Sequence, residues 1–163
     1  MISKKMQDAI NNQIQAELQS AYLYLAMSAY CDEQNLKGFA HWLQVQYQEE
    51  TSHAMKLYSH LLERGGSIEL KAIDAPGTSF GSTLEVFEKV LAHEKHVTSL
   101  INNLYEVALE EKDYPAQIML HWFIEEQVEE EASASEIVEK LKMVGDKLSS
   151  ILYLDKAMGK RGE

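Results

Sequence analysis

Four long segments of the chain alternate apolar and polar residues with the period of an α-helix. Their apolar positions recur at steps of three and four, which places them along one face of each helix. Cap and turn residues mark the ends: Ser3 precedes the first segment, Gly65-Gly66 follows the second, and Ser82 with Glu85 makes a capping box before the third. We therefore predict helices over about Ser3–Asp32, Leu36–Arg64, Ser82–Lys112 and Asp113–Gly145, and a short amphipathic helix over Asp146–Met158.

The connections between these helices differ in length. Only a few residues join the first helix to the second and the third to the fourth, which makes each pair an antiparallel hairpin. The second and third helices are separated by the glycine-rich segment Gly65–Gly81, which contains Pro76. About 17 extended residues reach about 55 Å, whereas a helix of about 27 residues is about 40 Å long. The segment can thus run the length of the bundle, so we predict an all-α four-helix bundle with a long crossover that makes the third helix parallel to the second.

The composition is that of an ordinary globular protein, with 45% apolar and 25% charged residues. The length fits a single domain over residues 1–163. The net charge of −11 argues against a nucleic-acid partner, because little basic surface remains to neutralise phosphates. No apolar run reaches the ~18 residues that a membrane span requires, and the first residues lack a signal-type segment. We therefore predict no membrane partner. Cys31 is the single cysteine and can form no internal disulfide, which favours a reducing compartment, so we predict a cytoplasmic protein.

A carboxylate interrupts the apolar face of each long helix near its midpoint. Glu17, Glu50, Glu94 and Glu130 occupy positions that the helical period assigns to the core, and His53 lies one turn after Glu50. No Lys or Arg falls on these faces, so burying the four carboxylates together without cations would be very unfavourable. Two divalent cations would balance their charge. An oxygen-rich site with one imidazole suits iron or manganese better than a structural zinc ion, although zinc could occupy it as an inhibitor.

At these residues the chain resembles the bacterial non-haem ferritins, and the resemblance extends over essentially its whole length. The symmetric form of the ferritin-like di-iron motif has a second Glu-x-x-His on the fourth helix. Here Gln127 is followed by Glu130 without a histidine, and Thr51 stands where bacterioferritins carry a haem-ligating methionine, so the resemblance implies no haem. The matching residues are Glu17, Glu50-Thr-Ser-His53, Glu94 and Glu126-Gln-Val-Glu-Glu130.

The resemblance implies a role for each residue of the di-iron site. Glu17 and His53 would hold one iron ion. Glu94 and Glu130 would hold the other, and Glu50 would bridge the two.

The resemblance also implies roles around this pair. Gln127 would orient the oxidant or a bound water. Tyr24, one heptad beyond Glu17, would donate an electron or hydrogen-bond a ligand, with simple core packing as the alternative. A third iron site beside the pair would use four acidic residues, Glu49, Glu126, Glu129 and Glu130. The alternative is that these residues form only a solvated acidic surface.

The function that the resemblance implies is iron storage with ferroxidase activity. Ferrous iron would be oxidised at the pair by dioxygen or hydrogen peroxide, and the ferric oxide would collect inside a hollow shell of 24 subunits. A di-iron peroxidase or oxygenase and a passive metal buffer stay open as alternatives, and a helical interaction module is a third. The short last helix carries Leu148, Ile151 and Leu154, which need a cover, either from another subunit or from the end of their own bundle.

Overall fold

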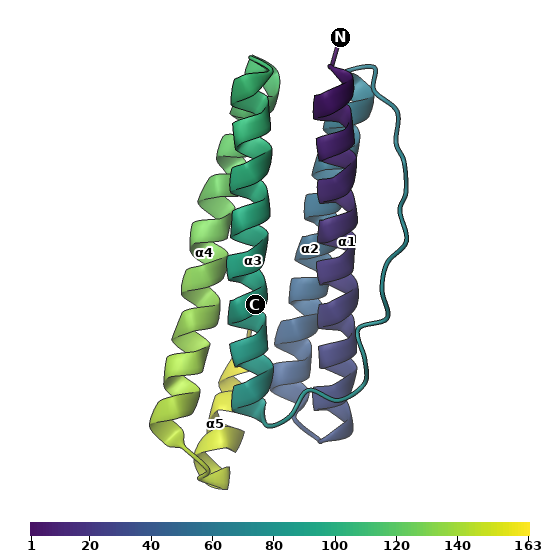
Figure 1. Cartoon of the computed structure of the whole chain (residues 1–163). Coiled ribbons are helices and arrows are strands. Elements are labelled where there is room, and N and C mark those ends of the chain that lie inside the picture. Colours follow the sequence, from purple (N-terminus) through teal and green to yellow (C-terminus); the bar gives the residue numbers. More distant parts are fainter.

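A computed structural model describes residues 1–163 as five helices without a strand (Figure 1). Each helix begins and ends within about two residues of its predicted bounds, and the fold class predicted from the sequence is confirmed. None of the helices combines the length and apolarity needed to cross a bilayer. The helices are α1 Lys4–Glu33, α2 Lys37–Glu63, α3 Thr83–Glu110, α4 Tyr114–Val144 and α5 Leu148–Met158.

Side chains cap three of the four long helices, and two of these caps, at Ser3 and Ser82, were predicted from the sequence. The Ser3 side chain accepts a hydrogen bond from the backbone N–H of Met6, and Ser82 and Glu85 make both bonds of the capping box. Asp113 accepts from the backbone N–H of Ala116 at the start of α4. These side chains satisfy backbone N–H groups that have no partner inside the helix, which fixes where each helix begins.

The crossover between α2 and α3 runs along the outside of α1 from one end of the bundle to the other (Figure 1). Two amide side chains of α1 hold it by pairing with its backbone. Asn11 donates to the carbonyl of Ser67 and accepts from Glu69 N–H, and Gln19 makes the equivalent pair with Asp74. As predicted, α3 therefore starts at the opposite end from the crossover's origin and runs parallel to α2.

The core consists of two apolar clusters at different heights in the bundle. One contains residues such as Tyr24, Phe39 and Phe87, and the other contains residues such as Ile10, Leu57 and Phe123. Along every long helix the two sets of residues are separated by a short polar stretch. The bundle thus holds a buried polar layer between two apolar halves.

Helix α5 packs across the end of its own bundle, against α2. Ile151 and Leu154 lie against the nearer apolar cluster, so the chain itself covers two of the three apolar residues predicted to need a cover. Leu148 stays 68% exposed. The carboxylate of Asp155 accepts from the backbone N–H of Phe39 at 2.9 Å and so caps α2, which has no side-chain cap of its own.

Gly38 sets how closely α5 approaches α2. A Cβ atom at this position would lie 1.5 Å from the backbone oxygen of Asp155. The substitution Gly38→Ala is therefore expected to displace α5 and to lower the free energy of unfolding by about 1–3 kcal/mol, measured by denaturant titration. The matched control is Gly159→Ala, because a Cβ there meets nothing closer than 3.4 Å and should change little. Equal effects of the two substitutions would contradict this account of the contact.

Candidate metal centre

The polar layer brings together one or two predicted site residues from each long helix. Glu17 comes from α1, Glu50 and His53 from α2, Glu94 from α3 and Glu130 from α4. All five side chains are buried, although four of them are carboxylates. The helical period put these residues on core-facing stripes, and the packing of the four helices brings them to one depth.

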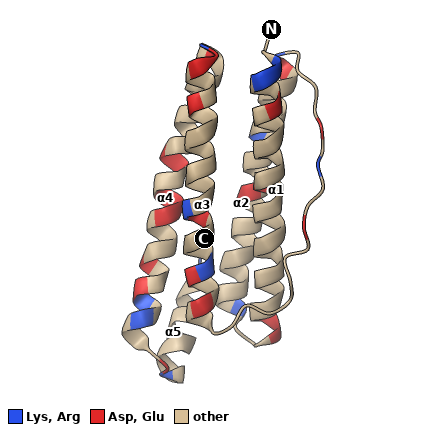
Figure 2. Cartoon of the chain, viewed as in Figure 1, with Lys and Arg blue, Asp and Glu red and all other residues tan.

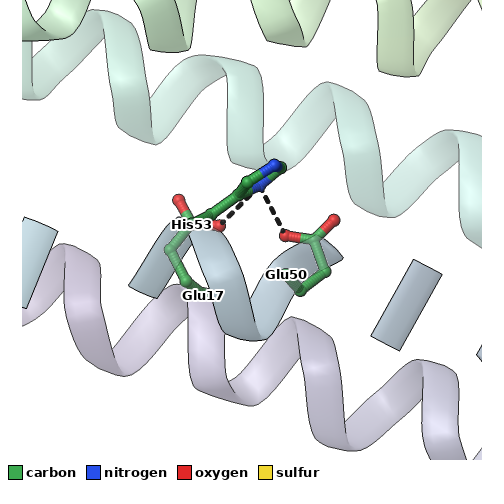
Figure 3. Close-up of side chains that lie close together, drawn as sticks. All are labelled: Glu17, Glu50 and His53. Atoms are coloured by element: carbon green, nitrogen blue, oxygen red, sulfur yellow. Dashed lines mark ion pairs between the residues drawn. The ribbon is translucent and has the colours of Figure 1, made fainter. Parts of the chain in front are cut away.

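The first group of potential ligands is Glu17, Glu50 and His53 (Figure 3). His53 Nδ1 lies 3.3 Å from Glu50 Oε2 and 3.9 Å from Glu17 Oε2. These two oxygens, Glu17 Oε2 and Glu50 Oε2, are buried and have no hydrogen-bond partner. A buried carboxylate oxygen without a partner is costly, and a cation placed between the three side chains would remove that cost.

The second group consists of Glu50, Glu94 and Glu130, each offering an oxygen within 4.8 Å of the others. Glu50 thus belongs to both groups. Because a carboxylate has two oxygens, it can serve two adjacent metal ions at once. The arrangement is compatible with two neighbouring cations that share one carboxylate, as the sequence-based hypothesis of a bridging Glu50 requires.

Two glutamine side chains donate hydrogen bonds to three of the four carboxylates. Gln13 Nε2 donates to Glu17 Oε1 at 2.8 Å, and Gln46 Nε2 donates to Glu50 Oε1 at 3.0 Å and to Glu130 Oε2 at 2.8 Å. These bonds leave the opposite oxygens of Glu17 and Glu50 facing the metal positions. Sequence reasoning assigned neither glutamine to the site. A signal was present, since each lies four residues before its carboxylate, which is the spacing at which side chains meet on a helix.

Burial raises the pKa values of all four carboxylates, and the charges of neighbouring carboxylates raise them further. Burial is the largest cause for each one. The charge of Glu50 raises the pKa of Glu17 further, and the charge of Glu94 helps to raise the pKa of Glu130 to about 8. Four anionic groups so close together favour binding protons or metal cations. The donor set of carboxylates and one imidazole fits iron, as predicted from the sequence.

Comparison with known proteins agrees with this geometry. The family profile described as "Ferritin-like domain" matches residues 7–144. The chain belongs to the ferritin family. It is 46% identical to the bacterial non-heme ferritin of Bacteroides fragilis over 99% of this chain and 100% of that protein. It is 38% identical to the bacterial non-heme ferritin of Staphylococcus aureus, with coverage of 99% and 97%.

A solved structure supports the same assignment. The open pore ferritin of the hyperthermophilic archaeon Archaeoglobus fulgidus superposes with a TM-score of 0.97 at 48% identity, covering 99% of each chain. The resemblance to bacterial non-haem ferritins inferred from the sequence is thus confirmed. In this ferritin-family chain, the buried Glu and His groups form a site compatible with two iron ions.

The acidic residues predicted for a third iron site do not all meet. Acidic residues concentrate in the middle of α4 (Figure 2). Of these, Glu126 and Glu130 form a third group with His53, whose Nε2 lies 3.9 Å from Glu126 Oε1. Glu129 is exposed and belongs to no such group. Glu49 is paired with Arg161, whose Nη2 lies 2.5 Å from Glu49 Oε2.

Gln127 and Tyr24 both contact Glu94. Gln127 Nε2 lies 3.3 Å from Glu94 Oε2 and also reaches the Glu94 carbonyl and Thr98 Oγ1. The Tyr24 hydroxyl donates to Glu94 Oε1, and burial together with the neighbouring carboxylates raises the pKa of Tyr24 well above its usual value. The structure thus places both residues as hydrogen-bond donors to one candidate ligand in this ferritin-family site. Their predicted roles toward the oxidant stay predictions.

Proposed function

We propose that the protein oxidises ferrous iron at the buried centre and stores the ferric product as a hydrated oxide. The observation that carries this proposal is the pair of ligand groups sharing Glu50, with unpartnered oxygens on Glu17 and Glu50 directed at one of the two positions. Membership of the ferritin family supports it. Iron is the substrate and cargo in this reading, and no haem takes part.

The chain's residues would hold two ferrous ions side by side. Glu17 and His53 would bind one ion, Glu94 and Glu130 the other, and Glu50 would lie between them. Each ferrous ion loses one electron. Dioxygen takes both electrons with two protons to give hydrogen peroxide, or hydrogen peroxide takes both with two protons to give two waters. Two adjacent ions let a single oxidant collect both electrons in one encounter, which is the benefit of holding them together.

The wider assembly belongs to the same proposal. Similarity to ferritins over nearly the full chain supports a shell of 24 subunits in the cytoplasm that collects the oxide. A third ion beside the pair would use Glu126 and Glu130, which already lie near His53, and would draw in Glu49 and Glu129 only if their side chains turned toward it.

One experiment separates this function from its alternatives. Ferrous iron is added to the metal-free protein in air, the absorbance of ferric product is followed, and the mixture is then sized by chromatography. Rapid oxidation with iron retained in a large particle supports storage. Turnover of an added organic substrate or of peroxide without retained iron would instead indicate a peroxidase or oxygenase. Oxidation no faster than in a protein-free control would leave only a passive buffer and would overturn the proposal.

A further inference from the structure

The segment after α5 turns back along α2 and carries Arg161 to the edge of the metal centre. The Arg161 guanidinium lies over the Trp42 ring, with Cζ 4.1 Å from the ring centroid, and Nη1 donates to the Trp42 carbonyl at 3.1 Å. The backbone carbonyl of Arg161 accepts from His41 Nε2 at 2.8 Å. Only 20% of the Arg161 side chain is exposed. This arginine is therefore held by specific contacts and does not extend freely into solvent.

Arg161 determines which way the buried Gln46 amide faces. Its Nη2 donates to Gln46 Oε1 at 2.9 Å and to Glu49 Oε2 at 2.5 Å. A guanidinium only donates, so the atom of Gln46 that faces it must be the oxygen. The NH₂ group of Gln46 is then directed to the other side. There it donates to both Glu50 and Glu130.

The opposite orientation of this amide would be unfavourable. A flipped Gln46 would place its oxygen against the carboxylates of Glu50 and Glu130 and its NH₂ group against the Arg161 guanidinium. Donor would then face donor, and acceptor would face acceptor, inside a buried layer where unpaired polar groups are costly. Arg161 thus fixes the amide, and the amide in turn joins Glu50 on α2 to Glu130 on α4.

We propose that Arg161 is a positioning residue of the metal centre, acting through Gln46 on Glu50 and Glu130. The proposal rests on the proposed function in that these carboxylates bind metal. Arginine suits the task because its planar fork serves the Gln46 oxygen, the Glu49 carboxylate and the Trp42 carbonyl together. Mutation of a residue that orients a metal ligand typically lowers metal affinity by about 10–100-fold.

Anaerobic titration of the metal-free assembled protein with Co²⁺ tests the proposal, because Co²⁺ binding is visible by absorbance and involves no oxidation. We expect Gln46→Leu to weaken binding at the pair by about 10-fold and Arg161→Ala by about 3–10-fold. Arg161→Lys should give a partial loss, since a compact ammonium cannot reach the three acceptors that the wider planar guanidinium reaches together. Lys160→Ala is the matched control: Lys160 is the exposed neighbour and its side chain makes no hydrogen bond or ion pair, so binding should be unchanged.

The double variant Gln46→Leu with Arg161→Ala distinguishes positioning from a general role in docking the C-terminal segment. If Arg161 acts through Gln46, the double variant binds Co²⁺ like Gln46→Leu alone. Losses that multiply, or an Arg161→Ala protein that binds like the wild type, would overturn the inference while leaving the proposed function intact. A wild-type protein that fails to bind two Co²⁺ ions per chain would overturn both.

Discussion

Replacing Glu50 with alanine is expected to slow ferrous-iron oxidation by more than about 100-fold. Glu50 is the one carboxylate common to the groups proposed to hold the iron pair, Glu17–Glu50–His53 and Glu50–Glu94–Glu130, so its loss removes a ligand from each position at once. Removing a residue that only supports a ligand already costs up to about 100-fold. Loss of the shared ligand itself should cost more, because the two ions would no longer be held as a pair.

Initial rates of oxidation in air, measured at matched iron-to-protein ratios, give the comparison. Glu50→Gln keeps the side-chain volume and should be nearly as slow as Glu50→Ala, because an amide brings no negative charge to the ions. Glu88→Ala is the control, since Glu88 is exposed on α3 and makes no ion pair. A Glu50→Ala protein that keeps even a third of the wild-type rate would rule out a shared carboxylate at the centre of the reaction.

The metal-free protein is expected to lose stability as the pH rises from about 5 to about 8. Glu130 has an ordinary pKa of 4.5 in the unfolded chain and a pKa of about 8 in the folded protein, where burial and the Glu94 charge favour the protonated form. Between these values the folded state binds more protons than the unfolded state. The contribution of Glu130 to the free energy of unfolding is therefore complete below about pH 4.5 and is lost as the pH rises toward 8.

The size of this loss should be on the order of 3 kcal/mol from Glu130, since each unit of pKa difference corresponds to about 1.4 kcal/mol. The raised pKa values of Glu17, Glu50 and Glu94 act in the same direction. Guanidinium unfolding of metal-free protein across this pH range measures the loss. Glu130→Gln should flatten the curve, whereas added Co²⁺ should reverse its slope because metal binds the deprotonated carboxylates. Stability that rises toward pH 8 without metal would contradict the assigned electrostatics.

Much of the fold could be predicted because helices carry local signals. The steps of three and four in the apolar pattern gave the long helices, and Ser82 with Glu85 marked a boundary that the structure reproduces. The length of Gly65–Gly81 was enough to predict the crossover, since chain reach is a simple geometric limit. The amides of Asn11 and Gln19 that hold this crossover could not be foreseen, because nothing local indicates which polar side chains will meet an extended chain.

The residues of the metal centre likewise fall into those that the sequence predicted correctly and those that it could not resolve. Glu17, Glu50, Glu94 and Glu130 were found because one helical period gives both the face and the depth of a mid-helix residue. Glu49 and Glu129 each precede a buried carboxylate, Glu50 or Glu130, in the sequence. In the structure Glu49 pairs with Arg161 and Glu129 is exposed. Sequence spacing alone did not separate these residues from Glu126, because it does not give the rotation of each helix relative to its neighbours.

The sequence by itself determined five helices, their connectivity and a ring of buried carboxylates, because these follow from periodicity, chain length and the cost of burying charge. Only the tertiary structure decided which side chains surround those carboxylates. Arg161 reaches Gln46 across 115 residues of sequence, and the bond exists because α5 packs closely on Gly38 and directs the following segment back along α2. Contacts of this kind depend on how packed surfaces fit together, and no local pattern in the chain specifies that fit.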